Sequence, residues 1–339
     1  MARDTLQKFM FEGAPVRGEL VELSETWREV QSLRTYPAPI RTLLGEMLAA
    51  AALLSANLKF NGAIIMQIYG DGPVRLLVVE CDGALQMRAT AKFDPDAVIG
   101  DDNGLTQLVN LHGNGRFVIT LDPKDKLPGQ QAYQGVVPLD GDDVATVIEN
   151  YMLRSEQLDT RLWLAADEHV SRGLLLQKLP GESAGDTRQV AQQSDRNEQN
   201  LDQPQSPLID EPGHDQDHPS DTETTWERSV MLASTLKNEE LLVTDIETLM
   251  RRLFWEETIR LFDATHPTFL CTCSRERVGN MLKMLGPHEV AEALAENGLV
   301  GVDCEFCGKH YDFDKVDCTQ LFATDDVVPM PASGSQALH

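Results

Sequence analysis

The chain has 339 residues and carries 54 acidic against 29 basic side chains, which gives a formal net charge of −25. A hydrophobic fraction of 42% is sufficient for a packed core, so the chain as a whole is not disordered. The acidity argues against a broad nucleic-acid-binding face and against docking on an anionic membrane, because most of the surface would repel phosphate groups.

A chain of this length favours two domains, or one large domain beside a smaller one. Its first residues lack the apolar core of a secretory signal. The longest plainly apolar run, residues 47–54, is far shorter than the roughly 20 residues that cross a bilayer. We therefore expect a cytoplasmic protein that has no membrane partner.

Residues 1–178 have the pattern of one α+β domain. Apolar residues at helical spacing predict a helix with one apolar face over residues 39–58 and a second helix over 144–158. Short apolar segments joined by turns predict strands over residues 63–69, 74–79, 116–120, 133–137, 161–164 and 174–179. Because several of these pair through short turns, antiparallel sheets are favoured over a doubly wound parallel sheet.

Residues 179–262 form a predicted linker with two different halves. Residues 181–225 contain eleven acidic residues, two arginines, four prolines and seven glutamines, a composition that predicts disorder. Residues 226–262 predict amphipathic helices, one of which follows a capping box over residues 244–247. The apolar stripe of that helix consists of Ile246, Leu249, Met250, Leu253 and Phe254. The helix either packs on the first domain or detaches to expose its stripe, and the sequence favours the first interpretation.

Five of the six cysteines lie near the C-terminus, and four of them form two close pairs, Cys271-x-Cys273 and Cys304-x-x-Cys307, separated by thirty residues. In a reducing compartment such a cluster is typically metal-binding or redox-active. Four thiolates satisfy the tetrahedral coordination that Zn²⁺ prefers. We therefore predict one zinc ion at these four cysteines, in preference to an iron–sulfur cluster.

The segment around the two pairs predicts a compact module over residues 263–320. Ser274 can cap a first helix, Gly286-Pro287 can start a second, and Gly298 can end it. Gly308 after the second pair is typical of a knuckle, a tight turn whose amides point at the sulfurs. Because the module has few apolar residues, a metal would supply much of its folding free energy.

The remaining candidates are predicted to have structural roles. His310 lies close behind Cys307, but four thiolates already fill a tetrahedron, so the imidazole is placed on the surface. Cys318 is predicted to be a spare thiol, and Cys81, at the end of an apolar strand, a small core residue. Residues 321–339 are predicted to form a flexible tail.

The sequence carries no pattern of a catalytic site. A phosphate-binding glycine loop and a His-Glu-x-x-His motif are absent from it. The one Gly-x-Ser-x-Gly string, residues 181–185, lies in the acidic segment and not between a strand and a helix, where a nucleophile elbow requires it. An all-cysteine metal site also leaves no open coordination position. We therefore predict that the protein is not an enzyme and has no catalytic residue.

The Cys271-x-Cys273 spacing is unusual for a purely structural zinc site. A disulfide closed across one intervening residue is strained and therefore comparatively easy to reduce. Two thiols this close can also react quickly, because the second is always within reach of the first once it is oxidised. The spacing therefore favours redox chemistry, and a plain zinc ribbon remains the alternative.

Several segments of the chain match one known family. They are the stretches that begin Cys271-x-Cys273-Ser-Arg-Glu-Arg and Cys304-x-x-Cys307-Gly-Lys-His-Tyr, together with residues 16–20, 58–60, 70–73, 133–137 and 154–158. On these segments the chain resembles the redox-regulated holdase chaperones, the 33-kilodalton heat-shock protein family. The resemblance covers nearly the whole chain outside the acidic insert, which is longer than the linker expected for this family.

The resemblance implies a mechanism that the spacing alone does not give. In the family the reduced form holds zinc through four thiolates, which here correspond to Cys271, Cys273, Cys304 and Cys307. Oxidation implies disulfides Cys271–Cys273 and Cys304–Cys307, loss of zinc, and unfolding of the module and the adjoining linker. The oxidised protein is then expected to form a homodimer and to hold unfolding client proteins without ATP.

Two other classes of function serve as alternatives to the holdase. A zinc ribbon that binds nucleic acid is disfavoured, because residues 264–318 carry five basic against nine acidic residues and no basic stripe. A thiol–disulfide oxidoreductase is disfavoured as well. Its Cys-x-x-Cys pair usually starts a helix, whereas Cys304 follows a strand-like segment and precedes a predicted hairpin strand.

Overall fold

The computed structural model describes residues 3–58, 60–125, 132–180 and 221–323. The first part of the chain contains β1 (Thr5–Phe11), β2 (Val16–Leu23), α1 (Glu25–Leu33), α2 (Ala38–Ser55), β3 (Gly62–Tyr69), β4 (Val74–Asp82), β5 (Gln86–Phe93), α3 (Leu105–Val109), β6 (Arg116–Pro123), β7 (Tyr133–Val137), α4 (Val144–Ser155), β8 (Thr160–Ala166) and β9 (Ser171–Lys178). The second part contains α5 (Asp221–Ala233), α6 (Asn238–Val243), α7 (Ile246–Phe254), β10 (Ile259–Leu261), β11 (Thr268–Phe269), α8 (Arg275–Leu285), α9 (Pro287–Asn297), β12 (Val300–Asp303), β13 (His310–Phe313) and α10 (Lys315–Ala323).

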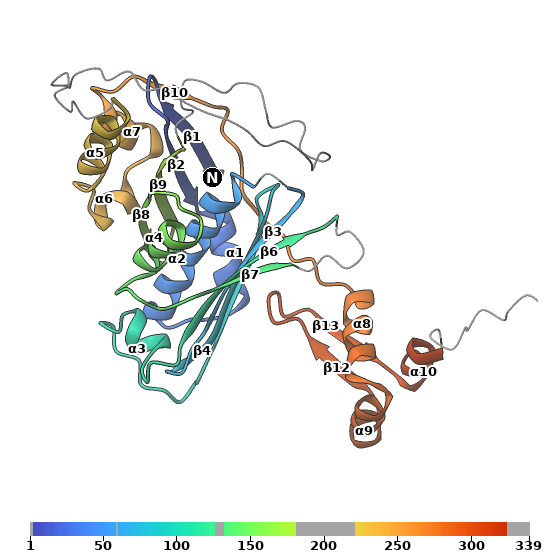
Figure 1. The fold of residues 1–339 in the computed structure, drawn as a ribbon. Helices are drawn as coiled ribbons and strands as arrows, with labels where there is room; N and C mark the ends of the chain where they lie inside the picture. The colour runs from blue at the N-terminus through green and yellow to red at the C-terminus, as the bar shows by residue number, and fades with distance from the viewer. Residues whose placement is uncertain (1–2, 59, 126–131, 181–220, 324–339) are drawn as a thin grey trace, which may run out of the picture.

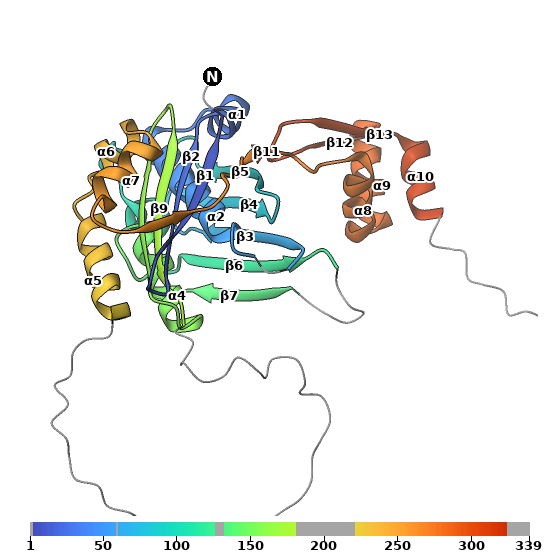
Figure 2. The same cartoon turned by 90° about the horizontal axis from the view of Figure 1, so that it is seen from above.

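Two sheets enclose helix α2 (Figures 1 and 2). Their strand orders are β10-β1-β2-β9-β8 and β11-β5-β4-β3-β6-β7, and every pair is antiparallel except β11 with β5. Helix α2 is bonded to both sheets, because the Ser55 hydroxyl donates to the Cys81 carbonyl and the carbonyl of Gly45 accepts from the Ser171 hydroxyl. The predicted α+β class with antiparallel sheets is confirmed.

Helix α2 differs from its prediction in two respects. It ends at Ser55 rather than at residue 58, and its alanine run, residues 49–52, is completely buried, so the helix is enclosed rather than amphipathic. Small side chains allow this enclosure: a Cβ added at Gly45 would lie 2.4 Å from the Ala166 methyl. By length and composition the helix also meets the criterion for a membrane span, with 72% of its span buried inside the protein. Burial on this scale is what a core helix between two sheets shows.

The remaining strand and helix predictions of the first part are confirmed with shifted ends. Strand β4 continues to Asp82, three residues beyond the prediction, and helix α4 stops at Ser155. Strands β1, β2 and β5 and helices α1 and α3 were not predicted. Strand β2 is almost entirely buried, so the alternation of polar and apolar residues that marks a half-exposed strand is weak there.

Helices α5, α6 and α7 cover the outer face of the first sheet (Figure 1). The apolar stripe of α7 packs into a cluster with β1 and β2, where the Phe254 ring lies 5.5 Å from that of Phe9 and 5.3 Å from that of Phe11, centroid to centroid. The packed interpretation of this helix is therefore confirmed. The predicted capping box is one residue out of place, because Asp245 rather than Thr244 caps α7 by accepting a hydrogen bond from the Thr248 amide.

The predicted bounds of the acidic segment and of the C-terminal tail are corrected. Helix α5 already begins at Asp221, inside the segment predicted as disordered, and residues 181–220 of that segment lie outside the described residues. Helix formation is cooperative, so packing around Ala233 extends α5 into a sequence whose composition is polar. Helix α10 likewise runs through residues 321–323 of the predicted tail, and residues 324–339 lie outside the described residues.

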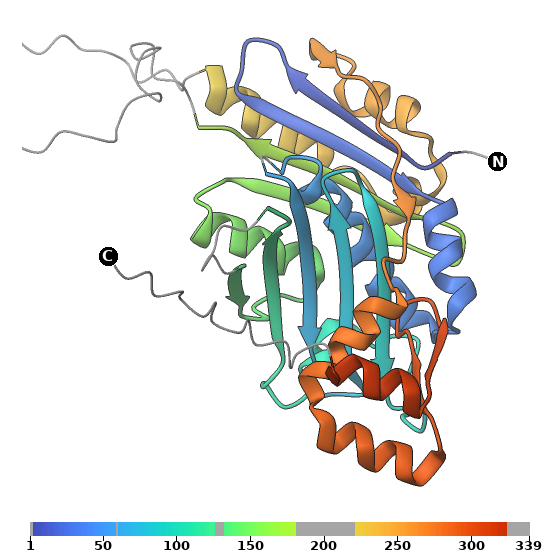
Figure 3. The ribbon, with the colours of Figure 1, turned by 90° about the vertical axis from the view of Figure 1, so that its right-hand side faces the viewer.

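The C-terminal module stands beside the second sheet (Figure 3). Helices α8 and α9 pack with the β12–β13 hairpin and α10 around a small core, whose buried members are Leu282, Val290, Val300, Tyr311, Phe313 and Cys318. The predicted starts and ends of the first two helices are confirmed. The Ser274 hydroxyl caps α8, and Gly298 ends α9 in the left-handed conformation that glycine adopts freely.

Candidate metal centre

The structure brings the four predicted cysteines together. The sulfurs of Cys271, Cys273, Cys304 and Cys307 all lie within 4.8 Å of one another. The Cys271 and Cys304 sulfurs are 3.7 Å apart, and those of Cys273 and Cys307 are 3.4 Å apart. A tetrahedral ion with zinc–sulfur bonds of about 2.3 Å requires sulfur–sulfur distances of about 3.8 Å. The cluster can therefore hold one tetrahedral metal ion with little movement.

Two backbone features position these sulfurs. Cys271 and Cys273 lie between β11 and α8, so the helix cap at Ser274 fixes the second thiol against the first turn of α8. Cys304 and Cys307 occupy the turn of the β12–β13 hairpin, where the Gly308 amide donates to the Cys304 carbonyl at 2.7 Å and the Cys304 amide donates to the Lys309 carbonyl at 2.9 Å. Gly308 has φ +66°, which confirms the predicted knuckle.

The thiols differ in acidity. Burial opposes ionisation of Cys273, but hydrogen bonds, led by one that the Tyr311 hydroxyl donates at 3.1 Å, lower the pKa of its thiol to about 7. Burial raises the pKa of Cys271 and raises that of Cys307 to about 12. Of these three thiols Cys273 therefore ionises most readily, and a thiolate is the form that binds a metal or attacks an oxidant.

The residues predicted to lie outside the cluster do so. His310 is exposed between two carboxylates, with Nδ1 2.6 Å from Asp303 and Nε2 2.7 Å from Asp312. Cys318 is buried in the core of the module, and Cys81 is buried in the core between the sheets. Desolvation raises the pKa of Cys81 to about 12, so this thiol is inert at neutral pH.

Sequence reasoning missed the contacts that this centre makes outside its own four sulfurs. Tyr311 was expected only as a hairpin residue, yet its hydroxyl bonds Cys273. Arg88 of β5 was not singled out, yet its guanidinium lies 3.8 Å from the Cys271 sulfur and stacks on the Phe306 ring. The alternation Arg88-x-Thr90-x-Lys92 is the sequence signal that could have pointed to a polar docking face on a strand.

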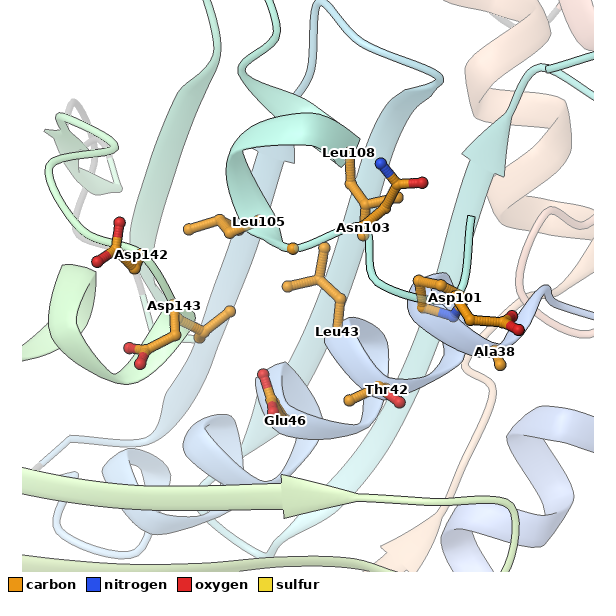
Figure 4. A pocket seen from close by; sticks show the side chains of 13 residues that line it. Ala38, Thr42, Leu43, Glu46, Asp101, Asn103, Leu105, Leu108, Asp142 and Asp143 are labelled. Carbon is orange, nitrogen blue, oxygen red and sulfur yellow. The ribbon is translucent and has the colours of Figure 1, made fainter. Parts of the chain in front are cut away.

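A hollow of about 270 Å³ lies between α2, α3 and the start of α4, and no cysteine lines it. Figure 4 shows Glu46 of α2 on its wall with Asp142 and Asp143, the two residues that precede α4. Burial raises the pKa of Glu46 to about 8, and the neighbouring Asp143 carboxylate contributes. The only other metal-type group in the described part of the chain is the exposed set His288, Glu289 and Glu292 on α9.

The fold and the cluster together define a class of protein. It has an α+β body of two antiparallel sheets and a separate small module in which four cysteines can hold a metal with no open coordination position. A family model described as Hsp33 protein matches residues 4–314 of the chain. The chain belongs to the Hsp33 family, which is a family of chaperones and not of enzymes.

Curated relatives carry the same assignment over their whole length. The chain is 43% identical to the 33 kDa chaperonin of Chromobacterium violaceum, across 99% of this chain and 98% of that protein. It is 42% identical to the 33 kDa chaperonin of Methylobacillus flagellatus, across 96% and 97%. A solved structure of the 33 kDa chaperonin from Thermotoga maritima has the same fold, with a TM-score of 0.69 at 18% identity, and the match covers 95% of this chain and 99% of that one.

Membership of a chaperone family implies that the partners of the chain are unfolded proteins. The structure also weakens the oxidoreductase alternative. The Cys304-x-x-Cys307 pair of this chain lies in the turn between β12 and β13, as predicted, whereas a thioredoxin-like motif begins a helix.

Proposed function

We propose that this protein is a redox-regulated, ATP-independent holdase that prevents unfolding proteins from aggregating under oxidative stress. The observation that carries the proposal is that four thiols of one small module lie within 4.8 Å of one another, where they can hold a metal ion. In this proposal Cys271, Cys273, Cys304 and Cys307 bind one Zn²⁺ in the reduced, inactive form. When bound, zinc supplies charge neutralisation and folding free energy to the module.

The size of the module's core supports a fold that depends on its ligands. Only six of its residues are buried apolar side chains or thiols, and three helices and a hairpin rest on them. A core of this size supplies little stability by itself. Oxidising the four cysteines therefore removes the main support of α8, α9 and the hairpin.

Oxidation is proposed to form the disulfides Cys271–Cys273 and Cys304–Cys307. Forming each disulfide removes two electrons from a pair of thiolates, and these electrons, with two protons from the solvent, reduce one molecule of peroxide to two of water. The shortest sulfur contacts run between the pairs rather than within them, so mapping the disulfide-linked peptides is the direct test of this pairing.

The remaining parts of the proposal follow the resemblance. The division into residues 1–178 for client binding and dimerisation, 179–262 as linker and 263–320 as switch is a working division. The oxidised form is proposed to be a homodimer located in the cytoplasm, with no nucleic-acid or membrane partner. Exposed apolar surface released from the linker helices would bind the exposed apolar surface of a client, and the net charge of −25 would keep this form soluble.

The test is light scattering of a chemically unfolded client diluted into buffer. The zinc-loaded reduced protein is compared with the same protein treated with peroxide at elevated temperature. Suppression by the oxidised sample alone is the expected result. Equal suppression by both samples would remove the redox switch, and suppression by neither would leave a structural zinc module.

A further inference from the structure

The two residues between the cysteines of the knuckle, Glu305 and Phe306, contact the first domain. The Glu305 carbonyl accepts a hydrogen bond from the Thr90 hydroxyl at 2.9 Å. The Glu305 carboxylate pairs with Lys92 at 2.7 Å and with Arg34 at 3.5 Å. The knuckle thus presents an anionic side chain to a cationic corner of the body, in a protein whose overall charge is strongly negative.

Arg88 continues the same face. Its guanidinium is held on the body by Glu80 at 2.6 Å and lies over the Phe306 ring, 4.0 Å from the centroid. It also lies 3.8 Å from the Cys271 sulfur. Arg88, Thr90 and Lys92 alternate along β5, so they project from one side of the strand and together form the receiving surface.

A short strand pairing completes the attachment. Strand β11 runs parallel to β5, and the Thr268 and Leu270 amides donate to the carbonyls of Leu85 and Met87 at 3.0 and 2.9 Å. Cys271 lies two residues after the end of this strand. Both cysteine segments therefore contact β5, one through main-chain hydrogen bonds and the other through the Glu305-Phe306 side chains.

The half of the attachment made by Glu305 and Phe306 can separate without opening the main core, whereas the β11 half includes Phe269, which packs against that core. The side chains of Arg34, Lys92 and Glu305 are 38%, 47% and 50% exposed, and exposed ion pairs contribute at most about 1 kcal/mol each. A hollow of about 480 Å³, lined partly by Arg88 of the body and by Thr272 and Arg277 of the module, lies beside these contacts. A hydrophobic interface of the same extent would be far harder to open.

We propose that Glu305 and Phe306, called the docking key below, attach the metal module to β5. We further propose that their release from β5 is the step by which oxidation of the cysteines is transmitted to the first domain. Only the second of these two statements, on transmission to the first domain, rests on the proposed redox function. The key is held in shape by the knuckle hydrogen bonds of Cys304 and Gly308. Bonding the Cys304 and Cys307 sulfurs to each other draws together the two ends of the segment that carries the key, which withdraws Glu305 and Phe306 from their partners.

The test uses charge reversal on both sides of the contact in the full-length, reduced, zinc-loaded protein. Glu305→Lys and Lys92→Glu each break the ion pair, and the double variant restores it with the charges exchanged. Lys92→Glu changes a residue of the first domain. It therefore tests the same ion pair without altering the cysteine module, even if Glu305→Lys disturbs the knuckle. Glu296→Lys, on exposed α9 away from the contact, is the matched control for charge.

The primary readout is hydrogen exchange at the Thr268 and Leu270 amides, with bound zinc measured in parallel. We expect each single variant to exchange about fivefold faster than wild type with zinc retained, since an exposed ion pair contributes at most about 1 kcal/mol. The double variant is expected to recover most of this difference but not all of it, because Glu305→Lys still places a positive charge beside Arg34. The control is expected to match wild type. Unchanged exchange in both single variants overturns the docking key. Because hydrogen exchange is measured without an oxidant, it tests the docking of Glu305 and Phe306 even if the proposed redox function is wrong.

The signalling half has its own readout. With the module undocked, the single variants are expected to suppress client aggregation after a lower dose of peroxide than wild type requires. Faster exchange with an unchanged dose would keep the docking contact but overturn its role in signalling. Absence of any oxidation-dependent activity in wild type would instead count against the proposed function, and the exchange result would still stand.

Discussion

The Tyr311 hydroxyl donates a hydrogen bond to the Cys273 sulfur at 3.1 Å. The tyrosine lies on β13 and the cysteine directly before α8, so this bond ties the hairpin of the module to its helical half. A hydrogen bond to a thiolate stabilises the charged form, which is why Cys273 titrates near 7 despite its burial. One hydroxyl thus supports both the fold of the module and the reactivity of the thiol.

Replacing Tyr311 with Phe removes this donor and leaves the ring in the core. The pKa of Cys273 is expected to rise toward its ordinary value, so a proton competes better with the metal at neutral pH. Loss of one charge-assisted hydrogen bond of about 1.5 kcal/mol corresponds to roughly tenfold weaker zinc binding. Competition with a chromophoric chelator measures the affinity, with Tyr69→Phe, at the exposed end of β3, as control. Equal affinities for both variants would contradict a role for the hydroxyl.

Substituting any one of the four clustered cysteines is expected to abolish stoichiometric zinc binding and to unfold the module. Cys307→Ser is the clearest case, because the knuckle keeps its glycine while losing one sulfur. Cys318→Ala removes a buried thiol of the same module without touching the cluster and is expected to retain the metal. Metal content and amide exchange over residues 275–323 separate the two results. Zinc retention by Cys307→Ser would show that the cluster is not the site.

The cysteine module was the most predictable part of the structure. Its determinants are local: Ser274 before a helix, Gly298 after one and Gly308 after the second pair each impose a backbone conformation that depends on few neighbours. Two short cysteine pairs then have only one compact way of meeting. Local signals of this kind can be read from a sequence without knowing the rest of the fold.

The contacts that cross between distant segments could not be predicted. Nothing near Arg88 or Thr90 in the sequence indicates that residues more than 180 positions later will lie against them. The enclosure of α2 was missed for the same reason, because an alanine run fits both an exposed helix and a helix buried between two sheets. The packing of α7 was predicted as a stripe, but its partners Phe9 and Phe11 belong to a strand that the pattern did not reveal.

Shortening Phe254 is expected to loosen α7 from the first sheet without any oxidant. Phe254→Ala removes a ring that is 2% exposed and contacts Phe9 and Phe11, and truncations of this kind cost about 3–5 kcal/mol. The reduced variant should bind more of an apolar fluorescent dye than wild type and suppress client aggregation partly before oxidation. Trp255→Ala, the exposed neighbour at 75%, is the control. A reduced variant that is as inactive as wild type would show that this helix covers no client-binding surface.

Glu46 gives the first domain a pH dependence that is separate from the cysteines. Its pKa is raised to about 8 by burial and by Asp143, so the folded state holds this proton more tightly than the unfolded state does. The contribution of Glu46 to stability is therefore full below the ordinary carboxyl pKa. It is lost progressively as the pH rises toward 8, and it does not change further above that.

Glu46→Gln keeps the side chain neutral at every pH and should remove this dependence. The variant is expected to be about 2 kcal/mol more stable than wild type at pH 8.5, once solvent screening of the partly exposed carboxylate is allowed for, and to differ little at pH 5. Denaturant unfolding of the first domain at both pH values measures the difference. Glu29→Gln, an exposed carboxyl on α1, should change neither value. If Glu46→Gln shifted both values equally, the effect would come from altered packing in the hollow rather than from the proton.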